Sequence, residues 1–275
     1  MPLIIAATDF SDVAENAVNY ACSLASSQNA EVMVIHSFIV PVMFSDIPMP
    51  VSLMSDAQKD AEAQMKKLTD GMSKAYPGVK IKGKVIYGDT ISVIEEYSEE
   101  KHRPWLVVVG NSSTAENNAW PDSVLIDAFK KLRFPVLGVP PEAIFGGVKK
   151  LCLAYDNKHS SNDTALQQVA DISNRINAAL HVLNVQPDVH NQDNQEYIDG
   201  DAKKILDPLN VHYHFVYEST NINGTIEDFV KTNDIDWLIM IPHKHSFFEG
   251  LFHRSHTTSV ANHARIPILA LHEKH

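Results

Sequence analysis

Two stretches of the sequence combine an apolar run with small polar residues directly after it. Thr8 and Asp9 close the first run, and Ser11 follows at a predicted helix N-terminus. Gly110 and Asn111 close a later run. Glycine lets a backbone approach phosphate closely, and free N–H groups at a helix start favour negative charge. These positions are therefore compatible with a local anion site on backbone N–H groups.

The acid after the first run has a second interpretation. An Asp that follows a strand is also a frequent helix cap or turn former, so Asp9 alone does not specify a ligand. Asp156 follows the apolar run 151–155 in the same way, ahead of a second Ser-containing helix start. The repetition supports a shared architecture more strongly than it supports binding.

Catalytic and metal-binding motifs are weak or missing. The sequence has no nucleophile elbow, no P-loop and no zinc-protease motif. Ser112 and Ser123 are interpreted as loop and helix-start residues, because no general base can be named beside either. The pairs His-x-His at 243–245 and His-x-x-His at 253–256 have imidazoles at metal-ligand spacing. They lack a cysteine or a closed four-ligand set, so no metal is expected.

One pattern of strands and helices occurs twice in the chain. Trp105 to Gly110 matches Trp237 to Pro242, and Phe134 to Gly138 matches Ile266 to Ala270 at the same offset. Short β-branched runs alternate with helical patterns, which predicts parallel strands joined by crossover helices. In the first copy we expect strands at 3–8, 31–37, 80–87, 105–109 and 135–139, and helices at 12–27, 56–76, 90–100 and 121–132; the second copy is expected to repeat this order, with its second helix starting near Asp193.

The length of 275 residues fits two domains, which we place at 1–141 and 148–275. The linker from Pro140 to Gly147 has consecutive prolines, which stop a strand, and paired glycines, which loosen the chain. Residues 39–55 of the first copy have no counterpart in the second. Their three prolines predict an extended loop.

Composition limits the function classes. The hydrophobic fraction of 44% and the charged fraction of 21% are typical of a globular protein. The net charge of -11 is shared by both halves, which argues against binding to nucleic acid or to anionic membranes. No apolar run approaches the ~20 residues of a membrane span, and we expect a cytoplasmic protein. Cys22 and Cys152 are expected to be buried thiols.

The motifs together resemble the universal stress protein family over residues 3–272. The resemblance rests on the Asp after the first strand, the fourth strand that ends at a Gly-containing loop, and a Ser at the next helix start ahead of Pro-Val-Leu. It implies a Rossmann-like α/β fold of two tandem domains, each a five-stranded parallel sheet in the order 3-2-1-4-5 flanked by helices. It also implies ATP binding between strands one and four, with Asp9 and Asp156 contacting the adenine or the ribose.

The phosphate loop of the first copy departs from the family pattern Gly-x-x-Gly, a spacer, then Gly-Ser/Thr. Gly110 is kept, followed by Asn111 and Ser113, and Ser123 matches the final Ser. Asp122 replaces the last glycine, and its carboxylate would repel a triphosphate. This copy is therefore expected to prefer AMP or ADP to ATP.

The second copy departs differently. Pro242 replaces the first glycine, which removes an N–H donor and fixes φ. Arg254 and Ser255 replace the final pair. Arg254 either binds an anion or fills the space of the phosphates, and both interpretations stay open. A missing donor cannot be screened as a charge can, so residual binding is expected in the first copy, through Asp9, Gly110 and Ser123.

The predicted function is a cytoplasmic stress protein that binds an adenine nucleotide, a protein partner or both, without being an enzyme. The alternative is a slow ATPase, or a hydrolase of a small phosphorylated or acyl compound, in the same crevice.

Predicted contacts between the copies come from their last strands, Pro135–Val139 and Pro267–Leu271. Each would be an exposed sheet edge, and the resemblance implies that they pair antiparallel to make a pseudo-dimer within one chain. The apolar insert 39–55 is expected to cover its own crevice or a second chain, and two tandem chains are expected to form a homodimer.

Overall fold

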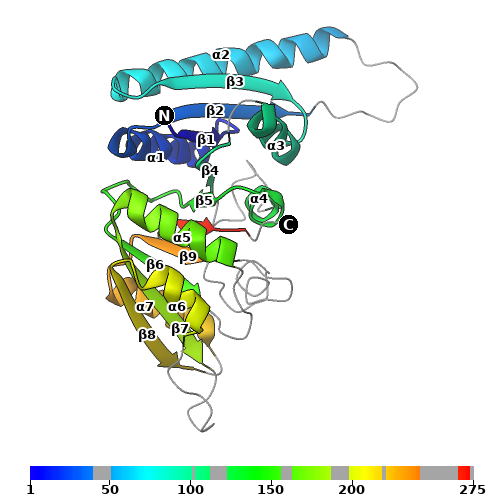
Figure 1. The fold of residues 1–275 in the computed structure, drawn as a ribbon. Helices are drawn as coiled ribbons and strands as arrows, with labels where there is room; N and C mark the ends of the chain where they lie inside the picture. Colours follow the sequence, from blue (N-terminus) through cyan, green and yellow to red (C-terminus); the bar gives the residue numbers. More distant parts are fainter. Residues whose placement is uncertain are drawn as a thin grey trace, which may run out of the picture.

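The part of the chain that the structure describes contains ten strands and seven helices. This computed structural model describes residues 1–39, 51–100, 103–111, 123–155, 163–186, 198–218, 221–241 and 266–272 (Figure 1). The first copy contains β1 (Leu3–Ala7), α1 (Asp12–Gln28), β2 (Glu31–Phe38), α2 (Val51–Ala75), β3 (Ile81–Tyr87), α3 (Thr90–Glu100), β4 (Leu106–Gly110), α4 (Ser123–Lys131) and β5 (Val136–Val139). The second copy contains β6 (Lys150–Tyr155), α5 (Asp163–Ile176), β7 (Ala179–Gln186), α6 (Gly200–Leu206), β8 (Val211–Tyr217), α7 (Ile222–Thr232), β9 (Trp237–Met240) and β10 (Ile268–Ala270).

All ten strands form one sheet in the order β3-β2-β1-β4-β5-β10-β9-β6-β7-β8. Read from either end, each half has the order 3-2-1-4-5, and its strands are parallel. The predicted α/β fold and strand order are therefore confirmed. The helix expected before β10 lies outside the described residues. The start of the helix expected near Asp193 also lies outside them, and the described helix α6 begins at Gly200.

The two halves join where β5 and β10 run antiparallel. Leu137 lies opposite Leu269 at the centre of this contact, with Gly138 opposite Ile268 and Val136 opposite Ala270. The predicted pairing of the last strands is confirmed. Because each strand takes up the free edge of the other, the pairing merges two sheets into one.

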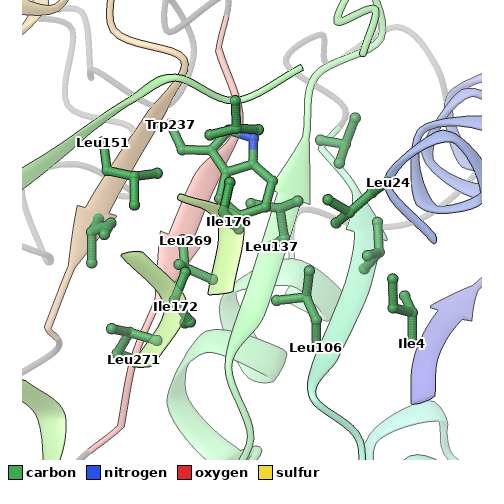
Figure 2. Packing of buried hydrophobic residues seen from close by; sticks show 14 of the residues in the cluster. Ile4, Leu24, Leu106, Leu137, Leu151, Ile172, Ile176, Trp237, Leu269 and Leu271 are labelled. Atoms are coloured by element: carbon green, nitrogen blue, oxygen red, sulfur yellow. The ribbon is translucent and has the colours of Figure 1, made fainter. Parts of the chain in front are cut away.

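The hydrophobic core also continues across the junction (Figure 2). One face of the sheet is covered by α1, α2, α5 and α6, and the other by α3, α4 and α7. Leu137 of the first copy and Leu269 and Trp237 of the second belong to the same buried cluster. The Trp237 indole Nε1 donates to the Tyr20 hydroxyl of α1 at 2.7 Å. The copies are thus packed together as well as paired.

The linker is more ordered than its paired glycines predicted. β5 ends directly before Pro140, as expected, but the chain then packs on α1. The Asn16 amide donates to the carbonyl oxygens of Pro140 (3.0 Å) and Ala143 (3.1 Å), and the Phe145 ring meets the Tyr20 ring edge-on at 5.2 Å. Side-chain contacts formed after the prolines therefore fix the part of the linker that contains Pro140, Ala143 and Phe145.

The insert prediction also needs a correction. Helix α2 begins at Val51, so the last residues of the segment 39–55 are helical rather than extended. Pro50 is the last proline of the segment, and the residues after it contain no helix breaker. Residues 40–50 lie outside the described part of the chain.

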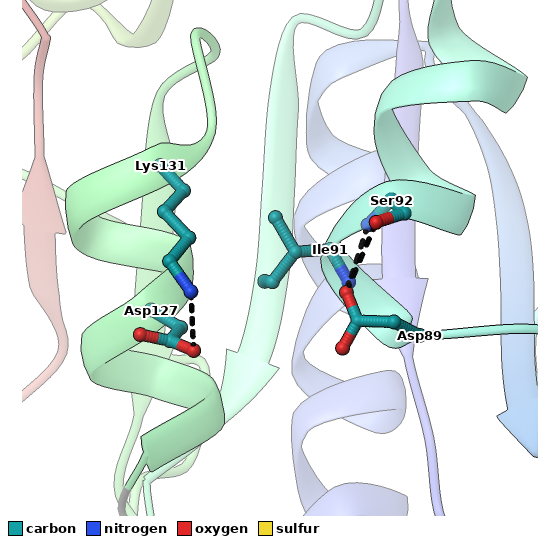
Figure 3. Close-up of polar contacts among 5 residues, drawn as sticks. All are labelled: Asp89, Ile91, Ser92, Asp127 and Lys131. Atoms are coloured by element: carbon teal, nitrogen blue, oxygen red, sulfur yellow. Dashed lines mark hydrogen bonds and ion pairs between the residues drawn. The ribbon is translucent and has the colours of Figure 1, made fainter. Parts of the chain in front are cut away.

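Local polar contacts stabilise helices α3 and α4 (Figure 3). The Asp89 carboxylate accepts hydrogen bonds from the backbone N–H groups of Ile91 and Ser92, both at 3.1 Å, and so caps the start of α3. In α4, Lys131 pairs with Asp127 one turn earlier at 2.9 Å. Both side chains of this pair are exposed to solvent, so α4 depends mainly on its buried apolar face.

Candidate functional site

The predicted site lies at the carboxyl ends of β1 and β4, which are neighbours in the sheet. Ala6 pairs with Val108, so the same register carries Thr8 to the level of Gly110. Strand order reverses between these two strands, because β2 and β3 follow on one side and β5 on the other. Ligands of open parallel sheets bind at such a switch point.

A tight turn from Thr8 to Ser11 connects β1 to α1. The Thr8 hydroxyl accepts from the Phe10 N–H at 3.0 Å, and the Asp9 Oδ1 accepts from the Ser11 N–H at 3.0 Å and from its hydroxyl at 2.6 Å. The Ser11 hydroxyl oxygen in turn accepts from the Ala14 N–H and caps α1. Asp9 is thus held in one orientation by the same contacts that start the helix.

The second carboxylate oxygen of Asp9 has no such contacts. Oδ2 is buried and accepts no hydrogen bond from any residue that the structure describes. A buried carboxylate oxygen without a donor is costly, and such exceptions mark places where a ligand or water supplies the donor. The hydroxyls of ribose and the amino group of adenine are donors of this kind, so the residues here fit that end of a nucleotide.

Phe10 and His36 complete the turn, and the sequence analysis missed both. The backbone of Phe10 has φ 65°, in the left-handed region that residues other than glycine rarely adopt. The centroid of its ring lies 4.4 Å from that of the His36 ring. His36 Nδ1 contacts the Thr8 carbonyl oxygen at 2.8 Å. Since a carbonyl only accepts, Nδ1 carries the hydrogen. The signal for His36 was its place near the end of β2, beside β1.

Gly110 has a packing reason for being glycine. A Cβ at this position would lie 3.0 Å from Val13 Cγ1, 3.1 Å from the Val13 carbonyl oxygen and 3.2 Å from its carbonyl carbon. The missing side chain therefore lets the end of β4 approach the first turn of α1. The next residue, Asn111, is buried, and its N–H donates to the Val139 carbonyl oxygen at 2.8 Å. That backbone donor serves the sheet rather than a ligand.

The second copy repeats part of this arrangement. Asn184, at the end of β7, donates to the Tyr155 carbonyl oxygen at 3.0 Å, as His36 does to Thr8 in the first copy. Its Oδ1 is also buried without a partner among the described residues. Among the other predicted site residues, Ser123 begins α4, and those outside the described residues are Ser113, Asp156, Arg254 and Ser255.

The cysteines and possible metal ligands do not form a further site in the described ranges. Cys22 and Cys152 are both buried and unbonded, as predicted. Burial raises the pKa of the Cys22 thiol to about 12 and raises that of Cys152 as well, which keeps both protonated. Within those ranges no three His, Cys, Asp or Glu side chains are arranged to hold a metal ion. The histidine pairs at 243–245 and 253–256 lie outside them.

Comparison with sequence profiles of known families matches the universal stress protein family twice, over residues 2–140 and 147–272. The chain belongs to the universal stress protein family. The resemblance drawn from its motifs is thus confirmed, as is the tandem arrangement of two such domains. A search of curated proteins finds no match. In the described residues no helix has the length and apolar character needed to cross a membrane.

Solved universal stress proteins share the fold at low sequence identity. A universal stress protein from Archaeoglobus fulgidus DSM 4304 is 14% identical with a TM-score of 0.67, covering 98% of this chain and 96% of its own. A putative universal stress protein from Pseudomonas aeruginosa UCBPP-PA14 is 13% identical with a TM-score of 0.53, covering 99% and 93%. A universal stress protein solved in complex with cAMP is 21% identical over 50% of this chain and 96% of its own, with a TM-score of 0.39.

Proposed function

We propose that the first copy binds an adenine nucleotide between β1 and β4, and that this cytoplasmic protein acts in the stress response through binding, without being an enzyme. The observation that carries the proposal is Asp9, whose Oδ1 is held by Ser11 while its buried Oδ2 has no donor among the described residues. A ligand with hydroxyl or amino donors would supply the missing hydrogen bond.

The charge of Asp9 sets the orientation that we propose for the nucleotide. A carboxylate attracts the N–H and O–H groups of adenine and ribose, and it repels phosphate oxygens. The base and the ribose would therefore lie toward the Thr8–Ser11 turn, with the phosphates toward Gly110 and the start of α4 at Ser123. The helix N-terminus there favours negative charge.

Asp122 precedes Ser123 in the sequence and is the reason to expect a short phosphate chain. Its carboxylate opposes the charge that a triphosphate would bring to the helix start. We therefore propose AMP or ADP rather than ATP as the ligand. The homodimer, an unidentified protein partner and the domain limits 1–141 and 148–275 belong to the same proposal and rest on the sequence argument.

The direct test is what the purified protein carries and what it binds. Protein from cells is denatured and its supernatant separated by anion exchange, which should release AMP or ADP. Calorimetric titration of the stripped protein should give saturable binding, tighter for AMP than for ATP. Absence of saturable binding for every adenine nucleotide would overturn the proposal. Hydrolysis of Mg-ATP above the blank would show an ATPase function instead of binding alone.

A further inference from the structure

A cluster of three histidines lies between β7, β8 and helix α7, away from the proposed nucleotide site. The rings of His181 and His214 are nearly parallel, and His181 Nδ1 lies 3.0 Å from His214 Nε2. His212 lies opposite His181 in the strand register, with its ring 5.1 Å away between centroids. Phe229 of α7 covers the pair, 4.8 Å from His214 and 6.4 Å from His181.

The contact between His181 and His214 requires uncharged rings. At 3.0 Å one nitrogen must donate and the other accept, and a neutral imidazole offers one of each. If both rings take up a proton, all four nitrogens become donors and the contact becomes repulsive. His212 lies beside His181 on the same face of the sheet. The contact is therefore favourable at neutral pH and becomes repulsive in acid.

The elements packed against the cluster carry charged groups of both signs. From β6, the Lys150 ammonium acts on His181 with the same sign as a protonated imidazole. Helix α7 contributes Glu227, which is half-buried, and Asp228 and Lys231, which are exposed. Burial, followed by the two neighbouring imidazoles and Lys150, lowers the pKa of His181 to about 4, and burial lowers that of His214.

The matching strand positions of the first copy hold other residue types in place of the three histidines. Cys152, His181 and His212 lie in one row across β6, β7 and β8, and the corresponding row in the first copy is Ile5, Met33 and Lys82. Two residues further along β3, Lys84 Nζ lies 5.2 Å from the centre of the Tyr97 ring of α3, in the place where His214 meets Phe229. The first copy thus has fixed charges and an apolar Met where the second has titratable rings.

We propose that the His181–His212–His214 cluster makes β8 and α7 an acid-sensitive element, which loosens from the second copy when the cluster takes up protons. Within this element, β8 is an edge strand that pairs with β7 alone, and Ile226 is the one fully buried residue that α7 contributes. Opening would expose the apolar face of α7, which includes Ile222, Phe229 and Val230. This proposal does not depend on nucleotide binding.

The direction of the pH effect follows from the lowered pKa values. Opened β8 and α7 would take up protons near the ordinary histidine pKa, about 6.5, before the closed form does. The closed form is therefore favoured above that pH and loses stability as the pH falls from about 6.5 toward about 4. Because His181 and His214 are only half-buried and solvent screens part of their charge, we expect a change of only about threefold to tenfold in the opening equilibrium at about pH 5.

Hydrogen exchange of the full chain, with a chelator present, measures this opening. Between about pH 7.5 and about pH 5, protection of residues 211–232, corrected for intrinsic exchange, should fall about threefold to tenfold. Protection of the equivalent residues 81–100 of the first copy should hold. In His181→Met, which installs the residue of the first copy, the loss should disappear. An equal loss in both segments, or one that persists in His181→Met, would overturn the proposal.

A second measurement covers the case in which His181→Met does not fold. The ring protons of His181 and His214 in the wild-type chain are followed by NMR as the pH is lowered. Both rings should titrate below the exposed histidines, at the pH where the signals of Phe229 change. Titration of both rings at the ordinary value, with no change at Phe229, would rule out an acid-sensitive element.

Discussion

Replacing Trp237 with alanine should destabilise the whole chain, by about 3–5 kcal/mol, because it removes the largest side chain that is fully buried among the described residues. Trp237 belongs to the second copy, but its Nε1 hydrogen bond goes to Tyr20 of the first. A common hydrophobic cluster surrounds both residues. We therefore expect a single unfolding transition in urea by far-UV circular dichroism, and hydrogen exchange should report the same loss of stability in the first copy as in the second.

Two milder variants separate packing from hydrogen bonding at this contact. Tyr20→Phe keeps the ring but leaves the buried Trp237 N–H without its acceptor, which should cost about 1–3 kcal/mol. Trp237→Phe keeps part of the volume and should lie between Tyr20→Phe and the alanine variant. If Trp237→Ala unfolds the second copy at lower urea while the first keeps its wild-type midpoint, the copies are independent units and the shared core does not couple them.

Gly110→Val should abolish nucleotide binding and also destabilise the first copy. The new Cβ would lie 3.0–3.2 Å from atoms of Val13, two of them backbone atoms that cannot rotate away. The start of α1 must then move relative to β4, which costs about 1–3 kcal/mol. The same movement displaces the Thr8–Ser11 turn that holds Asp9, so AMP affinity should fall by at least about tenfold.

Gly146→Val is the matched control for this change. Its Cβ would have nothing within 4 Å, and Gly146 lies in the segment after β5 rather than beside the crevice. Denaturation midpoint and AMP titration of this variant should both match the wild type. Wild-type AMP affinity in a folded Gly110→Val chain would show that the β1–β4 crevice is not the binding site.

Local patterns in the sequence were enough to predict the elements and the sheet, but not the contacts between distant segments. Short apolar runs, which alternate with helical patterns along the chain, predicted the strands of the first copy to within about two residues. The runs of β1 and β4 are continuously apolar because these strands are buried on both faces of the sheet. The strand order and the pairing of the last strands came from the family resemblance, which spacing alone does not provide. Helix α2 starts earlier than expected, since the effect of the prolines ends at Pro50.

The missed features of the site all depend on residues far apart in the sequence. Asn16 anchors a linker more than a hundred residues away, and His36 meets Thr8 and Phe10 only because β2 lies beside β1. His181, His212 and His214 looked like ordinary strand residues until the register placed them together. Asp9 was predicted correctly as a residue after β1, yet only the structure shows that one of its oxygens is held and the other is not.

The central claim is that the first copy holds the nucleotide through Asp9, and the pair Asp9→Ala and Asp156→Ala tests it most directly. Both acids follow the first strand of their copy, so they are matched in sequence position. Loss of a hydrogen bond to a charged group costs about 1.5–3 kcal/mol, or roughly tenfold to a hundredfold in affinity. Asp9→Asn, which keeps an oxygen for the Ser11 contacts, should weaken binding less than Asp9→Ala.

Calorimetric titration of AMP into the two alanine variants gives the decisive result. The account predicts that Asp9→Ala weakens AMP by at least about tenfold while Asp156→Ala keeps the wild-type dissociation constant. Saturable binding that survives Asp9→Ala but is lost in Arg254→Ala would contradict the account, because it would place the nucleotide in the second copy.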